Sequence, residues 1–202
     1  MKTITLSIGY LQENAYIYYD EIEKKACVID PGGEADRIAA RAAEEGLEII
    51  YILLTHGHYD HIGGVQALKA ATGAAVLAHE DEAPVLSNVR SSYAAAPLEP
   101  DGYLKDGDSV AIGSLKLDVI HTPGHTSGSC CYYDKNNNIL FSGDTLFRES
   151  VGRHDFPTGD RVKLMDSIRD RLLTLPDEVW VLPGHNQETT VKHERKNNPF
   201  IK

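Results

Sequence analysis

The sequence contains no apolar run approaching the roughly 18 to 20 residues that a membrane-spanning helix needs. Its first residues also lack the basic segment followed by an apolar core that marks an export signal. Both absences argue against insertion into a membrane and against export. We therefore expect a soluble, cytoplasmic protein.

Cysteine and positive charge are also scarce. Cys27, Cys130 and Cys131 are odd in number and lack CxxC spacing, and the adjacent pair would face opposite sides of a strand. We therefore predict three buried free thiols. The chain has 20 Lys and Arg residues against 30 Asp and Glu residues, a net charge of −10. This balance argues against a nucleic-acid partner and against an anionic membrane surface.

The length and composition of the chain are those of a folded globular protein. With 202 residues, 42% hydrophobic and 25% charged, we expect one globular domain over residues 1–202 with a sizeable core. Apolar alternation and turn residues predict strands at 3–8, 15–19, 26–29, 49–54, 74–78, 114–119, 129–133, 139–142 and 179–182. The order of these strands and the intervening helices predicts two sheets flanked by helices.

Three helices are predicted between these strands, at residues 34–45, 62–72 and 160–175. The last would place Val162, Met165, Ile168 and Leu172 on one apolar face. Residues 84–108 are rich in proline, serine and glycine, so we expect an irregular connection over the sheet that forms a wall of an active site.

Four side chains that can bind a metal follow the apolar strand at 49–54. They are His56, His58, Asp60 and His61, at spacing i, i+2, i+4 and i+5. This spacing fits neither a helix face nor strand alternation, so packing periodicity does not explain it. A solvated histidine-rich loop is the alternative, but imidazole and carboxylate groups leaving one strand end can converge on zinc or a neighbouring transition metal.

Three further residues of the same types occur where apolar strands end. His125 lies in the segment 122–126, Asp144 in 142–147 and His185 in 182–186. A glycine precedes each of them, which lets the backbone turn sharply next to an ion. Each motif alone is a modest signal.

In this order, HxHxDH followed by His, Asp and His, the motifs resemble the metallo-β-lactamase superfamily over essentially the whole chain. The resemblance implies an α/β (α+β) fold, a four-layer αββα sandwich with metals at one edge. It also implies that His56, His58 and His125 bind one ion, that Asp60, His61 and His185 bind a second, and that Asp144 bridges them. We expect two divalent ions, zinc first, with iron or manganese as alternatives.

Within the superfamily the chain is most similar to the glyoxalase II group, hydroxyacylglutathione hydrolases, and especially to its short bacterial members. The segments 142–147, 152–153, 183–185 and 198–200 carry this likeness. It implies a small-molecule thioester substrate and a substrate-binding role for Arg153, although a loop-bracing arginine is equally compatible. Full-length members add a C-terminal helical domain with basic glutathione-binding residues, and this chain stops at Lys202, so recognition of glutathione stays open.

The ligand set predicts a hydrolytic mechanism. Metal-bound water has its pKa lowered to about 7, and the resulting hydroxide would attack the thioester carbonyl. Asp60 is the candidate catalytic residue, because one oxygen can bind metal while the other orients the attacking water. The alternatives are a persulfide dioxygenase of the same superfamily with one iron, and a non-enzymatic module that metal merely stabilises. We set a β-lactamase aside, because such enzymes are exported and often place cysteine at the bridging position.

Two further expectations concern residues near or outside this set. Asp30, in an Asp-Pro-Gly sequence, either forms a plain turn or supports a histidine ligand from behind. His79 and His193 are expected to be exposed.

Overall fold

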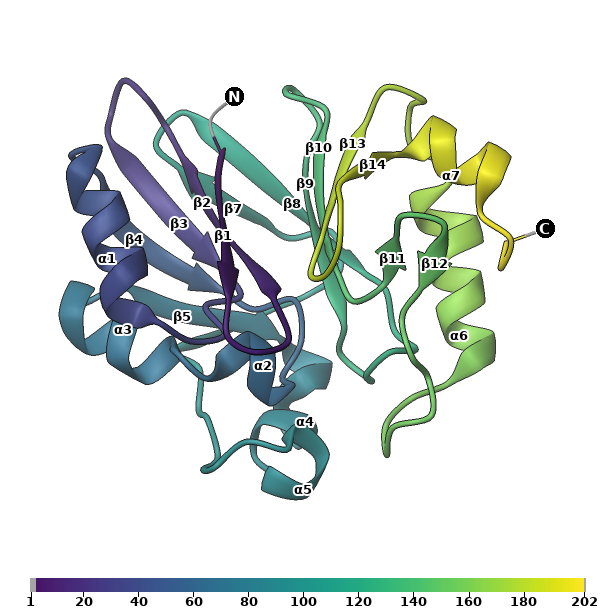
Figure 1. The fold of residues 1–202 in the computed structure, drawn as a ribbon, viewed down its shortest axis with the longest axis horizontal. Helices are drawn as coiled ribbons and strands as arrows, with labels where there is room; N and C mark the ends of the chain where they lie inside the picture. Colours follow the sequence, from purple (N-terminus) through teal and green to yellow (C-terminus); the bar gives the residue numbers. More distant parts are fainter. Residues whose placement is uncertain (1–2, 202) are drawn as a thin grey trace.

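Two six-stranded β-sheets lie face to face in the computed structural model, which describes residues 3–201. The first sheet has the order β1-β2-β3-β4-β5-β6 (Figure 1). Its strands are β1 Thr3–Ile8, β2 Glu13–Tyr19, β3 Lys25–Ile29, β4 Glu48–Leu53, β5 Ala75–His79 and β6 Gly102–Leu104. The strands from β1 to β3 pair antiparallel and those from β3 to β6 pair parallel.

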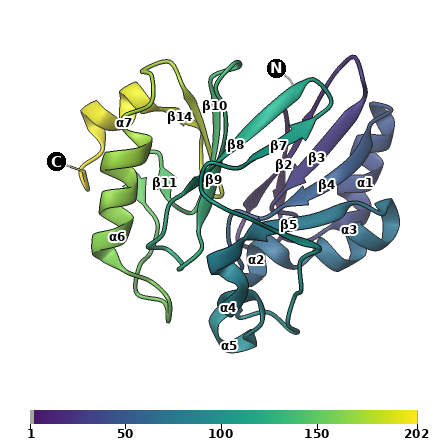
Figure 2. The same cartoon turned by 180° about the vertical axis from the view of Figure 1, so that it is seen from behind.

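Parallel pairing places the carboxyl ends of β3, β4 and β5 at one edge of this sheet. The crossover helices are α1 Ala35–Glu44, α2 Tyr59–Ile62 and α3 Val65–Thr72. After β5 come the 3₁₀ turn η1 Glu80–Glu82 and the short helices α4 Ala83–Leu86 and α5 Val89–Ser92, which Figure 2 shows at the bottom of the molecule. The edge where β4 ends is therefore lined by short, irregular elements.

The second sheet has the order β14-β13-β10-β9-β8-β7. Its strands are β7 Ser109–Ile112, β8 Leu115–His121, β9 Cys130–Asp134, β10 Ile139–Gly143, β13 Trp180–Pro183 and β14 Thr189–Thr190. Between β10 and β13 the chain forms the small hairpin β11 Leu146–Phe147 with β12 Ser150–Val151, then α6 Arg161–Asp166 and the π-helical turn η2 Ser167–Leu172. Helix α7 Val191–Asn197 follows β14.

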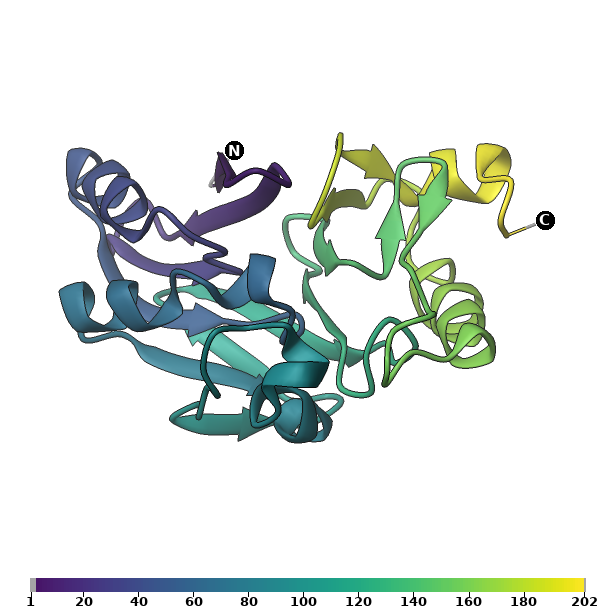
Figure 3. The same ribbon diagram turned by 60° about the horizontal axis from the view of Figure 1, so that its bottom comes forward.

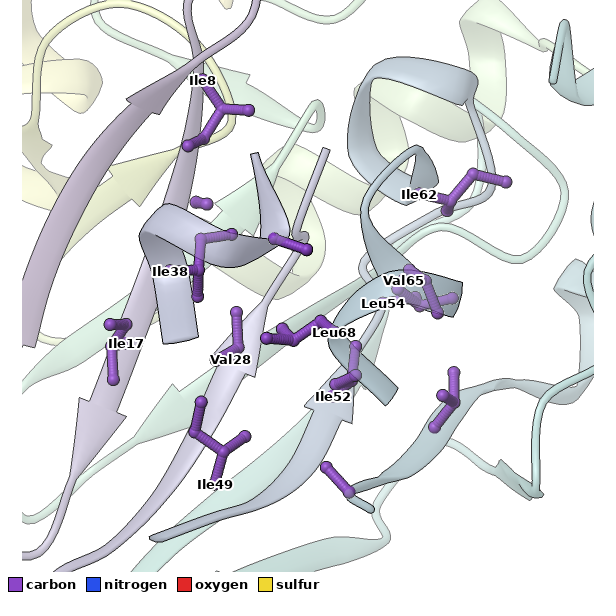
Figure 4. Close-up of a cluster of buried hydrophobic side chains, with 14 of the residues drawn as sticks. Ile8, Ile17, Val28, Ile38, Ile49, Ile52, Leu54, Ile62, Val65 and Leu68 are labelled. Carbon is purple, nitrogen blue, oxygen red and sulfur yellow. The ribbon is translucent and has the colours of Figure 1, made fainter. Parts of the chain in front are cut away.

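Three apolar clusters lie between four layers. Ile38 of α1 and Leu68 of α3 pack on Val28 and Ile52 of the first sheet (Figure 4). Aromatic side chains fill the space between the sheets, including Tyr18, Tyr132 and Phe141, and the third cluster joins the second sheet to α6 and η2. Figure 3 shows the blue helices α1 and α3 and the green-to-yellow helices α6 and α7 on opposite outer sides. This arrangement confirms the predicted αββα sandwich.

Two of the buried tyrosines between the sheets, Tyr18 and Tyr132, satisfy their hydroxyl groups within this region. Tyr18 donates to Asp134 Oδ2 at 2.6 Å, and Tyr132 donates to the carbonyl of Leu54 at 2.8 Å. A buried hydroxyl without such a partner would destabilise the fold, so these bonds fix how the sheets face each other. The thiols of Cys27, Cys130 and Cys131 are free and buried, as predicted, with Cys130 between the sheets and Cys131 on the outer face.

Two predictions about secondary structure were inaccurate. The helix predicted at 160–175 begins as expected, with Asp160 capping the amides of Val162 and Lys163, but it changes to π-helical geometry at Ser167. Its buried apolar residues are Leu164, Ile168 and Leu172, whereas Val162 is 67% exposed. Residues 84–108 are also less irregular than predicted, since they contain most of α4, all of α5 and β6.

None of the helices within residues 3–201 combines the length and apolar character needed to cross a membrane.

Candidate metal centre

The two sheets each deliver part of the predicted ligand set. His56, His58, Asp60 and His61 follow β4 of the first sheet, whereas His125, Asp144 and His185 follow β8, β10 and β13 of the second. The structure brings all seven together where these strands end. That these seven residues bind metal stays a prediction, and the distances between their side chains support it.

The first predicted ligand group is His56, His58 and His125, and one imidazole nitrogen of each converges on a common point. His125 Nε2 lies 3.2 Å from His56 Nε2 and 2.9 Å from His58 Nδ1. Two nitrogens bound to one tetrahedral zinc ion at about 2.0 to 2.1 Å are expected about 3.3 Å apart. Burial and the neighbouring histidines lower the pKa of all three rings, that of His58 to about 3. The rings are therefore neutral at pH 7, the form that binds a metal.

The second group combines two histidines, His61 and His185, with the carboxylate of Asp60. Asp60 Oδ2 lies 3.3 Å from His185 Nε2 and 3.9 Å from His61 Nε2. Asp144 stands between the groups, with Oδ1 3.4 Å from His61 Nε2 and Oδ2 3.6 Å from His125 Nε2. This is the position that a bridging carboxylate requires.

The electrostatics of the second group favour a bound cation. Burial opposes the charged form of His61, but Asp144 and Asp30 outweigh it and hold its pKa well above the ordinary value. The same balance, with Asp60 and Asp144, raises the pKa of His185. In the metal-free protein, protons on these rings supply the positive charge that the carboxylates attract.

Two buried atoms at the centre of the site support the same conclusion. His61 Nε2 and Asp144 Oδ1 have no hydrogen-bond partner among residues 3–201, although both are shielded from solvent. Buried polar atoms are normally satisfied, so these two fit the coordination of an ion that holds both. Neutral imidazoles and carboxylates together suit zinc, iron or manganese, and the donor set therefore fits the predicted metals.

Asp30 supports His61 from behind and also forms a turn. Its Oδ2 lies 3.0 Å from His61 Nδ1, and its carboxylate accepts hydrogen bonds from the amide and hydroxyl of Thr55 at 2.7 and 2.5 Å. The backbone of Asp30 adopts φ +49°, which asparagine and aspartate tolerate better than most residues. The carboxylate of Asp30 thus orients the His61 ring so that Nε2 faces Asp60 and Asp144.

The loop that carries His185 is tied to β2 of the other sheet, a support that sequence reasoning missed. Asn14 Nδ2 donates to the carbonyls of Pro183 and Asn186 at 3.1 and 3.0 Å, and Tyr16 Oη donates to the Pro183 carbonyl at 2.7 Å. Gly184 permits the close approach of this loop, because a Cβ there would lie 2.4 Å from Asp144 Oδ1. The only sequence signal was a polar residue within an apolar strand.

Glu13 is another buried residue next to the site that the sequence did not indicate. Its Oε1 lies 3.9 Å from His61 Nδ1, and neither carboxyl oxygen has a hydrogen-bond partner within the described chain. Burial raises the pKa of this carboxyl well above its ordinary value. Glu13 therefore favours the protonated form.

A cavity of about 930 Å³ opens onto the ligand groups. Its volume is within the range of about 300 to 1,000 Å³ that small-molecule sites occupy. The ligand residues exposed in it are His58, Asp60, His125, Asp144 and His185, and its walls include Tyr93, Phe147 and Phe156. Tyr93 belongs to the segment 84–108 that was predicted to form a wall of the site.

Arg153 also lines the cavity, but its guanidinium group already has partners. Nε and Nη2 donate to the two carboxylate oxygens of Asp155 at 3.0 and 2.8 Å, and Cζ lies 4.2 Å from the centre of the Phe156 ring. Its backbone carbonyl accepts a hydrogen bond from His125 Nδ1 at 2.7 Å. The main chain of Arg153 therefore orients a ligand histidine, and an anionic substrate would compete with Asp155 for the side chain.

Another cluster of potential ligands lies outside this set, and one of its residues contradicts a prediction. His79 is 3% exposed, not solvent-facing as expected, because its ring stacks on His121 with centroids 4.0 Å apart and an interplanar angle of 11°. His193 is only partly exposed. Together with Asp81, His79 and His121 have the composition of a metal site. However, imidazole lone pairs lie in the ring plane, and the planes of these two stacked rings are nearly parallel and separate, so their lone pairs do not converge on one ion.

Comparisons with known proteins agree with this geometry. The hydroxyacylglutathione hydrolase GloC of Haemophilus influenzae is 35% identical over 209 residues, which cover 100% of this chain and 98% of that protein. The crystal structure of the B3 metallo-β-lactamase BLEG-1 is 36% identical, with a TM-score of 0.90 over 98% of this chain and 99% of the other. The structure of TTHA1623 in a di-iron-bound form is 37% identical, with a TM-score of 0.87 and the same coverage.

A family model described as the metallo-β-lactamase superfamily matches residues 8–185, a span that includes all seven converging residues and most strands of both sheets. The chain therefore belongs to the metallo-β-lactamase superfamily.

Proposed function

We propose that the protein is a metal-dependent hydrolase with two metal ions that cleaves thioesters of the S-2-hydroxyacylglutathione class. The observation that carries the proposal is the pair of ligand groups that share Asp144 and face one cavity of about 930 Å³. The likeness to GloC of Haemophilus influenzae supports the choice of substrate class. Zinc is the metal we propose first, and the di-iron form of TTHA1623 supports iron as the alternative.

When bound, two divalent ions would supply hydroxide at neutral pH by lowering the pKa of a shared water to about 7. The residues of the chain then orient the reaction. Asp60 Oδ2 faces His185, and the same side chain lines the cavity, so its carboxylate can accept a hydrogen bond from the attacking water. Hydrogen bonding to His185 and the charge of His61 lower the pKa of Asp60 against the opposing effect of burial, which keeps it ionised.

The chemistry of the leaving group and the residues of the cavity wall also favour a thioester. A thiolate is a good leaving group and needs no strong general acid. Among the described residues that line the cavity, Arg153 is the sole Lys or Arg. Phe147, Phe156 and Tyr93 offer apolar contact to an acyl chain or a thiol carrier.

The test is turnover of S-lactoylglutathione by the metal-reconstituted protein, measured as release of free thiol. We expect release that needs added metal and that falls at least 100-fold in His185→Ala, because this variant leaves the second group incomplete. A panel of thioesters with uncharged thiol carriers should run in parallel, since Asp155 already occupies Arg153. If no thioester in the panel is cleaved above background by metal-loaded protein, the proposal is wrong.

The likeness to BLEG-1 favours one second candidate, hydrolysis of a β-lactam. Cleavage of a β-lactam amide releases an amine, which must gain a proton, whereas cleavage of a thioester releases a thiolate, which need not. A chromogenic cephalosporin in the same assay distinguishes the two reactions. The persulfide dioxygenase alternative needs one iron and leaves the complete second group without a role, and oxygen consumption with a persulfide would favour it over hydrolysis.

A further inference from the structure

A buried glutamate that is not one of the predicted ligands lies behind the first ligand group. Glu82 ends the 3₁₀ turn η1 and is 1% exposed. Within the described chain it has no Lys or Arg partner, so hydrogen bonds alone compensate its burial. A buried carboxylate destabilises a fold unless it is paired or well hydrogen-bonded. The groups that donate hydrogen bonds to Glu82 therefore stabilise its buried position.

Those groups belong to the two loops that carry the first ligand group. Glu82 Oε1 accepts a hydrogen bond from the amide of Gly57 at 2.7 Å. Gly57 lies between His56 and His58. Glu82 Oε2 accepts from the Thr126 hydroxyl at 2.7 Å and from the Gly128 amide at 2.8 Å, directly after His125. One carboxylate thus links a loop of the first sheet to a loop of the second.

The packing around these hydrogen bonds leaves little freedom. A Cβ on Gly128 would lie 2.1 Å from the backbone nitrogen of Glu82, so the turn and the loop are in direct backbone contact. The Ser127 hydroxyl also donates to the carbonyl of Asp81 at 2.9 Å. The separation between the His56–His58 loop and the His125 loop is therefore set through η1.

We propose that Glu82 is a positioning residue for the first metal: its carboxylate holds the two loops at the separation that lets His56, His58 and His125 bind one ion. The inference rests on the metal binding in the proposed function and adds a residue that contacts neither ion nor substrate. The hydrogen bonds of Glu82 reach the backbone and side chains next to His56, His58 and His125, and none reaches Asp60, His61 or His185. Loss of Glu82 should weaken one ion and spare the other.

The substitution that tests this is Glu82→Gln, which keeps the shape of the side chain. One oxygen becomes an NH₂ group, which then faces the N–H of Gly57, or the N–H of Gly128 and the hydroxyl of Thr126. At least one loop is therefore released. Glu80→Gln is the matched control, since Glu80 lies in the same turn, is exposed and pairs with Lys105 at 3.5 Å.

Each ligand group is measured separately, by zinc competition with a chromogenic chelator in two backgrounds. His185→Ala leaves the first group complete, and His125→Ala leaves the second group with Asp60, His61 and His185. In the His185→Ala background, we expect Glu82→Gln to weaken zinc by about 10- to 100-fold, the usual effect of losing a hydrogen-bonded support behind the ligands. In the His125→Ala background the change should stay within about threefold, and Glu80→Gln should have no effect in either.

A spectrum distinguishes positioning from general destabilisation. Cobalt bound in the His185→Ala background should show altered visible absorption bands after Glu82→Gln, while the unfolding temperature of the metal-free protein reports the fold. If the variant does not fold, Glu82→Asp is measured instead, because its shorter carboxylate cannot reach both loops. Equal weakening in both backgrounds, or unchanged affinity and spectrum in a folded variant, overturns the inference.

The outcome is independent of the substrate. If Glu82→Gln leaves zinc binding unchanged while thioesters are cleaved, the positioning role is wrong and the proposed function stands. If Glu82→Gln weakens the first ion but no thioester is cleaved, the positioning role stands and the substrate assignment is wrong.

Discussion

Asn14 connects a strand of the first sheet to the loop that carries His185, and its removal should weaken the second ion without unfolding the protein. The Asn14→Ala change removes two side-chain hydrogen bonds, one partly buried and one exposed. A net hydrogen bond contributes about 0.5 to 1.5 kcal/mol, so with the exposed bond discounted the loss is about 1 to 2 kcal/mol. If the whole of this free-energy loss lowers the stability of the bound position of His185, the zinc affinity of the second group falls about 5- to 30-fold.

Zinc competition in the His125→Ala background measures this affinity, and denaturant unfolding of the metal-free protein measures stability. Asn137→Ala is the matched control, because Asn137 Nδ2 also makes two hydrogen bonds, to Asp134 and Tyr18 at 3.0 and 3.4 Å, in the β9–β10 turn away from the predicted ligands. Both variants should lose similar stability, since the Pro183 carbonyl keeps Tyr16 as a donor. An Asn14→Ala affinity within twofold of the unsubstituted protein would refute the reasoning.

The remaining predictions concern stability and reactivity. Burial raises the pKa of Cys131 to about 11 and also raises the pKa of Cys27 and of Cys130 above the ordinary value, so a thiol reagent at neutral pH should label none of the three in the native protein and all three in denaturant. Burial and His121 hold the pKa of His79 below its ordinary 6.5, so its contribution to stability is present above that pH and is lost as the pH falls; the metal-free protein should lose less stability between about pH 7.5 and 5 after His79→Gln. Phe141→Ala, at a fully buried ring, should lower the free energy of unfolding by about 3 to 5 kcal/mol in urea titrations. Removal of metal by a chelator should lower the free energy of unfolding by about 2.7 kcal/mol relative to protein at 100 times the dissociation constant, and an unchanged melting temperature would contradict metal binding to the native state.

The parts of the centre that were predictable are those encoded within a few neighbouring residues. His56, His58, Asp60 and His61 follow one apolar strand, and the other three candidates each follow another, so the order of motifs was readable without coordinates. The four-layer fold was implied by the family resemblance and by alternating strands. Asp30 was left between two interpretations because its role depends on a positive φ and on contacts to Thr55 and His61, neither of which is visible in the sequence.

The supports of the centre were not predictable, because their partners are distant in the chain. Asn14 and the Pro183 carbonyl are 169 residues apart, and Glu82 reaches Thr126 across 44 residues. Of the apolar face predicted for the helix at 160–175, Ile168 and Leu172 are buried, whereas Val162 in the first turn of α6 is exposed. His79 was expected to be exposed because a lone histidine is polar, and stacking on His121 could not be foreseen.

The division of the ligands between the sheets has a mechanical consequence. The first sheet is built from residues 3–104 and the second from residues 109–190, and each predicted ion would draw ligands from both. Neither half of the chain alone holds all the ligands of one ion. The ions would therefore link the two sheets across the edge where they meet, here called the seam. Any fluctuation that parts the sheets at this edge would break bonds to both ions at once. Backbone amides along the seam should therefore exchange with deuterium much faster in the metal-free protein, while those under α1 and α3 keep their protection.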